Sequence, residues 1–228
     1  MERIARNLRE VNQRIAEAAG KVNRQPSEIT LVSVSKTFSV EIVEHAVAAG
    51  AKILGESRVQ EGIEKVKELG NIASWHLIGH LQTNKAARAV QYFDLIQSID
   101  SWHLAEKVSQ ASVRLNKKID CLLEVNSSGE ESKYGFPPDD LIEGAERIAT
   151  LPGINMKGLM TIGPWTDDAS EIQKAFEMTR KLFEAMRTQV GPYVDTLSMG
   201  MSSDYELAIK CGSNMVRVGT AIFGERTR

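Results

Sequence analysis

Short apolar runs alternate with helix-like segments along the whole chain. Eight runs have the length and composition of strands, and most lack the strict alternation of a half-exposed strand. Continuous apolar runs of this kind are typical of parallel strands that are covered on both faces. The predicted strands are residues 29–36, 52–56, 75–79, 93–99, 120–126, 156–162, 196–201 and 215–223.

The segments between these runs have the period of amphipathic helices. Between residues 172 and 186, apolar positions recur every three or four residues. The cluster at 137–140 predicts the start of another helix, and Ser203-Asp204-Tyr205-Glu206 matches a capping box. A further helix at the front is predicted to cover the other elements without joining their repeat. Its apolar face carries Ile4, Leu8, Val11 and Ile15.

Eight strand–helix units predict an α/β protein, folded as a single (β/α)8 TIM-type barrel with an extra N-terminal helix. The 228 residues then form one domain, 1–228, and a doubly wound open sheet is the alternative. Functional residues of such barrels gather at the carboxyl ends of the strands. The polar and glycine residues at or near those ends are Lys36, Ser57, His80, Asn126, Gly163, Ser202, Gly219 and Thr220.

Composition argues against several classes of partner. A formal net charge of −2 gives no general attraction to nucleic acid or to an anionic membrane. The front of the chain lacks the apolar segment of a signal peptide, and no run approaches the roughly 20 apolar residues of a membrane span. Cys121 and Cys211 have neither disulfide-framework nor zinc-ligand spacing. We therefore predict a cytoplasmic protein without a metal site.

Common site motifs are missing from the sequence. It contains no phosphate loop of the G-x-x-x-x-G-K-[ST] type, no G-x-G-x-x-G fingerprint and no H-E-x-x-H zinc helix. Trp75, Trp102 and Trp165 lack the basic neighbours of a nucleic-acid stacking platform and are predicted to be packing residues.

Lys36 stands out because it closes an apolar run just before a predicted helix. Burial disfavours the ammonium form of lysine, and the neutral amine is a nucleophile that can form a Schiff base. The alternative is a lysine whose stem lines the barrel mouth while its ammonium reaches water.

Two turns near the C-terminus are candidate anion sites. Ser202 and Ser203 follow a strand, where free backbone amides and a hydroxyl can bind phosphate. Gly219 permits close approach of the backbone to a ligand, and Thr220 adds a hydroxyl. Each of these turns is equally compatible with a simple helix cap.

Arg217 lies between two valines in the last predicted strand, where an unpaired guanidinium would be costly. Its partner is either a carboxylate, such as Glu56 or Glu124, or a ring nitrogen of a bound cofactor. A permanently protonated arginine would keep that nitrogen unprotonated and weaken the ring as an electron sink.

Taken together, the motifs resemble those of the pyridoxal phosphate homeostasis proteins, which are related to the N-terminal barrel of alanine racemase. The resemblance spans nearly the whole chain. Its motifs are VSVSKTFSVE, GESRVQEG, WHLIGHLQTNK, EVNSSGEESKYGF, KGLMTIG and SMGMSSDYELAIKCGSNMVRVGTAIFG.

The resemblance implies pyridoxal 5′-phosphate (PLP) as the cofactor, held by Lys36 as a Schiff base. Ser202, Gly219 and Thr220 would bind the phosphate, and Arg217 would face the pyridine nitrogen. At the second strand the family usually has the tripeptide Gly-Glu-Asn, whereas this chain has Gly55-Glu56-Ser57. Serine keeps a hydrogen-bonding group at the third position, but its side chain has a shorter reach than that of asparagine.

Three functions follow from this resemblance. The first is a non-catalytic PLP carrier that takes part in vitamin B6 homeostasis and amino-acid balance. This carrier is expected to be a monomer and to pass PLP to PLP-dependent apoenzymes. The second is a PLP-dependent racemase, and the third is a regulatory partner that senses PLP. Alanine-racemase-like enzymes have a further β domain that supplies a tyrosine base, and this chain stops at Arg228. The carrier is therefore the favoured expectation, unless Tyr134, Tyr205 or a residue in a loop replaces that base.

Overall fold

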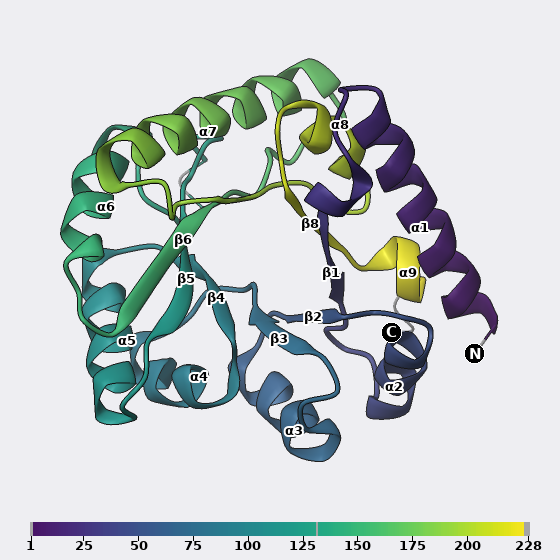
Figure 1. Cartoon of the computed structure of the whole chain (residues 1–228), viewed down its shortest axis with the longest axis horizontal. Coiled ribbons are helices and arrows are strands. Elements are labelled where there is room, and N and C mark those ends of the chain that lie inside the picture. Colours follow the sequence, from purple (N-terminus) through teal and green to yellow (C-terminus); the bar gives the residue numbers. More distant parts are fainter. Residues whose placement is uncertain (1, 131, 226–228) are drawn as a thin grey trace.

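Eight parallel strands close into a barrel in the computed structural model, which describes residues 2–130 and 132–225. Neighbours along the chain are neighbours in the sheet, and β1 pairs with β8 to complete the ring (Figure 1). The strands are β1 (Thr30–Val34), β2 (Ile53–Glu56), β3 (Ser74–Leu77), β4 (Leu95–Ile99), β5 (Ile119–Glu124), β6 (Ile154–Met160), β7 (Thr196–Ser198) and β8 (Met215–Val218). The predicted barrel is confirmed, and the open sheet is wrong.

Helices surround the barrel on its outer face (Figure 1). They bury their apolar sides against the outward-facing side chains of the strands, which explains why those strands are apolar on both faces. In chain order they are α2 (Val40–Ala48), α3 (Val59–Leu69), α4 (Ala86–Tyr92), α5 (Trp102–Arg114), α6 (Leu141–Ala149), α7 (Ala169–Val190), α8 (Tyr205–Lys210) and α9 (Thr220–Phe223). Short 3-10 turns occur at Pro26–Glu28, Thr83–Lys85 and Pro138–Asp140.

The predicted N-terminal helix is confirmed as α1 (Glu2–Gly20), which lies outside the repeat against α8 and α9 (Figure 1). Its four predicted apolar residues are all buried. Two polar side chains of α1 also reach the end of α9. Asn7 donates to the Ile222 carbonyl at 2.9 Å, and Arg3 donates to the Phe223 carbonyl at 3.4 Å.

Two predicted boundaries near the C-terminus are wrong. The last strand ends at Val218, and residues 220–223 form α9, because the chain turns at the barrel mouth after Gly219. The expected capping box also fails, since α8 begins at Tyr205 with Asp204 as its N-cap. The Asp204 carboxylate accepts from the Met201 amide at 2.5 Å, and Glu206 pairs with Arg14 of α1.

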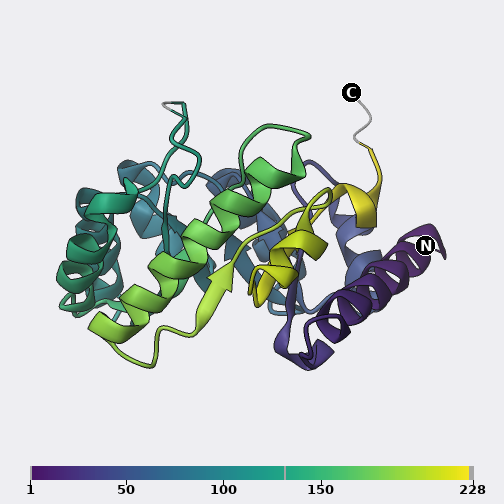
Figure 2. The same cartoon turned by 90° about the horizontal axis from the view of Figure 1, so that it is seen from above.

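The tryptophans differ from the uniform packing role that we predicted. Trp75 is buried, and Trp102 packs against the core beneath Arg147. Trp165 is 96% exposed, so its assignment as a packing residue is wrong. The loops after β5 and β6, the second of which carries Trp165, project from the same side of the barrel (Figure 2).

Among the described residues, no helix combines the length and apolar character needed to cross a bilayer.

Candidate functional site at the mouth of the barrel

A cavity of about 780 Å³ opens at the carboxyl ends of the strands. This volume is in the range of small-molecule sites. The structure brings all six candidate site residues into its lining, from the ends of β1, β2, β7 and β8: Lys36, Ser57, Ser202, Arg217, Gly219 and Thr220. Residues almost 200 positions apart in the sequence therefore meet in one place because β8 pairs with β1.

Lys36 lies in the turn between β1 and α2, two residues beyond the strand that we expected it to close. Its side chain is half-buried and lines the cavity. The next residue, Thr37, has a φ of 71°, in the left-handed region that β-branched residues rarely adopt. The turn that presents Lys36 therefore has an unusual backbone held by its surroundings.

Arg217 is 4% exposed and belongs to a buried polar network inside the barrel. Its guanidinium donates to the Ser198 hydroxyl at 2.5 Å and to the Thr161 carbonyl at 2.7 Å. Ser198 in turn donates to the Gln97 side chain at 2.7 Å, and the Gln97 amide lies 3.1 Å from Nδ1 of His76. Burial lowers the pKa of His76 to about 4, so this ring is neutral near pH 7.

Of the two carboxylates that we considered as partners of Arg217, one pairs with a different cation and the other interacts with Arg217 through its charge. Glu56 pairs with Lys65 at 2.7 Å, so it is not the partner of Arg217. Glu124 acts on Arg217 through its charge. Burial lowers the pKa of Arg217 to about 10, although Glu124 and Asp204 oppose this shift, and the guanidinium stays charged at neutral pH.

Burial also shifts the pKa of two carboxyl groups near this arginine. The pKa of Glu124 rises to about 7 through burial and the nearby charge of Asp100, against the opposing effect of Arg217. Burial also raises the pKa of Asp204. A charged Arg217 therefore lies near two carboxyl groups whose pKa values are raised by burial.

Ser202 lies beside the turn that contains Gly219. The Ser202 hydroxyl accepts from the Gly219 amide at 3.2 Å and from the Ala221 amide at 3.4 Å. Both bonds are long for N–H···O contacts. A Cβ at position 219 would lie 3.3 Å from the backbone oxygen of Val34, so glycine allows this turn to pack closely on β1. The result is a concave group of amide donors and hydroxyls at the cavity wall.

Ser57 follows β2 and is held by the neighbouring strand. A Cβ on Gly79 would lie 2.3 Å from the Ser57 carbonyl oxygen, so this contact requires glycine. Gly79 also lines the cavity.

The sequence analysis missed the apolar part of the cavity wall, which is formed by Phe38, Ile78, Ile162 and Met201. Each of these residues lies within two positions of a predicted site residue or strand end, which is the signal that would have found them.

Three other predicted strand-end residues do not line this cavity. His80 pairs with Asp100 at 2.9 Å, and its ring stacks on Tyr134 with centroids 3.7 Å apart. Asn126 stabilises its own loop by donating to the Glu130 carbonyl at 2.9 Å. Gly163 accepts from Lys133 through its carbonyl.

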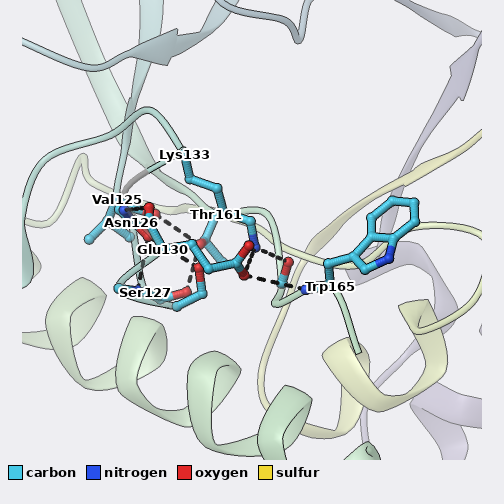
Figure 3. Close-up of polar contacts among 10 residues, drawn as sticks. Val125, Asn126, Ser127, Glu130, Lys133, Thr161 and Trp165 are labelled. Carbon is cyan, nitrogen blue, oxygen red and sulfur yellow. Dashed lines mark hydrogen bonds and ion pairs between the residues drawn. The ribbon is translucent and has the colours of Figure 1, made fainter. Parts of the chain in front are cut away.

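Lys133 joins the loops after β5 and β6. Its Nζ lies 2.7 Å from both Glu130 Oε1 and the Gly163 carbonyl (Figure 3). The same glutamate accepts from the Trp165 amide at 3.4 Å, while the indole points away from the polar contacts. These loops are therefore fixed to each other beside the mouth of the barrel.

Comparison with known proteins gives consistent matches over more than nine tenths of the chain. The family described as "Alanine racemase, N-terminal domain" matches residues 1–227. The pyridoxal phosphate homeostasis protein of Pasteurella multocida (strain Pm70) is 39% identical over 98% of this chain and 97% of its own length.

Solved structures agree with this assignment. A crystal structure of an unknown protein from Bifidobacterium adolescentis, 38% identical, has a TM-score of 0.93 over 97% of this chain and 94% of its own. PipY of Synechococcus elongatus PCC7942, solved with PLP bound, is 37% identical and has a TM-score of 0.81 over 92% of this chain and 100% of its own. The chain therefore belongs to the alanine racemase N-terminal domain family and, within it, to the pyridoxal phosphate homeostasis proteins.

Proposed function

We propose that this chain binds PLP in the cavity at the barrel mouth, with Lys36 joined to the aldehyde carbon as a Schiff base. The observation that carries the proposal is the convergence of six residues with matching chemistry on one cavity of about 780 Å³. The structure of PipY with PLP bound, from a relative 37% identical, supports the same ligand. PLP supplies a reactive aldehyde, and the chain supplies an amine, an anion site and a cation.

The wall formed by Ser202, Gly219 and Thr220 fits a phosphate group. The Gly219 and Ala221 amides make only long hydrogen bonds to the Ser202 hydroxyl, so they have donor capacity for a stronger acceptor. Phosphate oxygens are such acceptors. Two hydroxyls beside these amides add further donors.

Arg217 fits a position opposite the pyridine nitrogen. Its guanidinium remains protonated, since its lowered pKa of about 10 is still above neutral pH. A cation beside the ring nitrogen disfavours its protonation. An unprotonated ring withdraws electrons less strongly, which suits binding of the cofactor better than carbanion chemistry.

We further propose that the protein is a non-catalytic PLP carrier that takes part in vitamin B6 homeostasis and amino-acid balance, with PLP-dependent apoenzymes as recipients. A racemase would need a second base at the site. Tyr205 is 1% exposed, and burial raises its pKa. Tyr134 stacks on His80, and neither tyrosine lines the cavity. The described residues thus offer no tyrosine positioned for this role.

The same proposal includes a cytoplasmic location and a monomer. Both cysteines are free and buried, which fits a reducing compartment. Among the described residues, the large exposed hydrophobic side chains away from the mouth are dispersed, including Ile72 after α3, Val113 in α5 and Met178 in α7, whereas Tyr134, Ile162 and Trp165 lie at the mouth itself. Light scattering should therefore give the mass of one chain, 25.2 kDa, and a doubled mass would contradict the monomer.

The binding proposal is tested by the absorption spectrum of the protein with PLP, before and after borohydride reduction, followed by mass mapping. We expect a reducible chromophore on Lys36 that is lost in Lys36→Ala. Lys52→Ala is the matched control, because Lys52 is exposed and precedes β2 at the opposite end of the barrel. Modification scattered over surface lysines would contradict the proposal. Sustained racemisation of alanine by the purified protein would contradict the carrier role.

A further inference from the structure

A buried ion cluster lies beneath the turn that presents Lys36. Lys65, on α3, is 4% exposed and has three acceptors around its ammonium. Its Nζ lies 2.7 Å from Glu56 Oε1, 2.9 Å from Glu61 Oε1 and 2.8 Å from the Ser35 carbonyl oxygen. A lysine ammonium has three N–H donors, so these contacts satisfy it completely.

The cluster binds the backbone on both sides of Lys36. Before it, the Ser35 carbonyl accepts from Lys65, and the Ser35 hydroxyl donates to Glu56 at 2.6 Å. After it, the Thr37 amide donates to Glu61. Thr37 has a φ of 71°, a conformation that persists in a β-branched residue only when the surroundings hold it. The backbone at Lys36 is thus fixed from two sides by one set of charges.

These charges do not face the cavity. Lys65, Glu56 and Glu61 are absent from its lining, and Lys65 reaches the turn from α3, behind β1 and β2. Burial raises the pKa of Glu56 although Lys65 opposes the shift, and Glu56 Oε2 has no hydrogen-bond partner among the described residues. A buried and incompletely satisfied carboxylate is costly for stability, which suggests a role other than stability.

We propose that Lys65 is a positioning residue that fixes the turn around Lys36, so that the Lys36 amine meets the aldehyde of the bound cofactor in one orientation. This inference rests on the proposed function. The step forms a C=N bond between Nζ and the aldehyde carbon, and the aldehyde oxygen leaves as water with the two protons of the neutral amine. Small misplacements of a reacting group cost up to about 100-fold in rate.

The test separates the covalent step from binding of the ring and phosphate. Lys65→Met removes the ammonium, and Lys65→Met/Glu56→Gln also removes the carboxylate charge that would be left unpaired in the interior. Lys67→Met is the matched control, because Lys67 is exposed on the same helix. The rate of chromophore formation with PLP is measured by stopped flow, and borohydride reduction with mass mapping identifies the modified lysine. Pyridoxine 5′-phosphate, which has no aldehyde, reports the non-covalent affinity.

We expect both Lys65 variants to form the Lys36 bond about 10- to 100-fold more slowly, with pyridoxine 5′-phosphate affinity within about twofold of wild type. Folded variants that react at the wild-type rate would overturn the inference. A parallel loss of both the rate and the affinity would also overturn it, because it would indicate a general structural role. If neither Lys65 variant folds, Glu61→Gln provides the test, since Glu61 lies at the partly exposed edge of the cluster and contacts Thr37. A wild-type protein that forms no bond at Lys36 would instead refute the proposed function as well.

Discussion

Single residues at the barrel mouth are constrained by atoms that belong to neighbouring strands. Gly79 follows β3 and contacts the backbone of Ser57, which follows β2. Burial raises the pKa of Glu124, at the end of β5, and the nearby Asp100 adds to this shift while Arg217 opposes it. Both cases give predictions that a single substitution can test.

We expect Gly79→Ala to lower stability by about 1–3 kcal/mol and to weaken PLP uptake. The new Cβ would lie 2.3 Å from the Ser57 carbonyl oxygen, so the backbone at the end of β2 must move. Denaturant unfolding and PLP titration measure the two effects. Gly20→Ala is the control, because a Cβ there meets no atom within 4 Å. An unchanged unfolding midpoint for Gly79→Ala would show that the backbone of Ser57 does not exclude a side chain at position 79.

The pH dependence of stability should report the ionisation of Glu124. Its pKa is raised from the ordinary 4.5 to about 7, so the folded state binds more protons than the unfolded state between these values. The stability gained from this proton is present below pH 4.5 and is lost as the pH rises to about 7.

As the pH rises through this window, the wild type should lose stability and Glu124→Gln should not. The free energy of unfolding of Glu124→Gln should therefore increase relative to that of the wild type by about 3 kcal/mol, at about 1.4 kcal/mol per pH unit. Above the window the difference between the two proteins should stay constant. Urea unfolding from pH 4.5 to 8 measures this change. Glu146→Gln, at an exposed position on α6, should show no such trend. A constant difference for Glu124→Gln across the whole range would mean that the pKa of Glu124 is not raised.

At the scale of elements, α1 supports the C-terminal side of the site. It packs on α8 and α9, and its Asn7 and Arg3 side chains donate to carbonyls at the end of α9. The turn at Gly219 leads directly into α9. A helix outside the barrel repeat thus helps to hold one wall of the cavity.

Leu8→Ala should cost about 2–5 kcal/mol of stability, because Leu8 is buried between α1 and the barrel and its removal leaves a cavity. Arg9→Ala, one position along on the exposed face, should change stability by less than about 0.5 kcal/mol. Thermal or denaturant unfolding compares the two. Equal effects would mean that α1 does not bury this face in solution.

At the scale of the whole molecule, closure of the barrel makes the two ends of the chain interdependent. β1 is hydrogen-bonded to both β2 and β8, so neither end of the sheet has an unpaired edge. The helices cover the strands with two large clusters of buried side chains, one of which joins α1 to α8, β8 and α9. This arrangement favours our prediction that residues 1–228 form a single domain.

Unfolding should accordingly be one cooperative transition. Far-UV circular dichroism reports the helices, and tryptophan fluorescence, to which the buried Trp75 contributes, reports the packing around β3. We expect the two denaturation curves to coincide. Two separated transitions would indicate that part of the barrel unfolds on its own and would contradict the single domain.

The sequence by itself determined the fold and the candidate residues. Its apolar runs and helical periods are local properties, and they predicted all eight strands and α1. Because parallel strands place their carboxyl ends on one side of a barrel, the strand ends nominated five of the six site residues that line the cavity, but also His80, Asn126 and Gly163, which do not line it. Arg217 was nominated separately, because an arginine between two valines of an apolar strand needs a partner.

Only the tertiary structure decided which groups meet. The hydrogen-bond partners of Arg217 are Ser198 in β7 and Thr161, which follows β6, while Glu56 pairs with Lys65. The exposure of Trp165 and the start of α9 after Gly219 were likewise missed. Pairing of buried polar groups depends on distances across the barrel, and these are set by strand register and closure, which no local pattern of residues encodes.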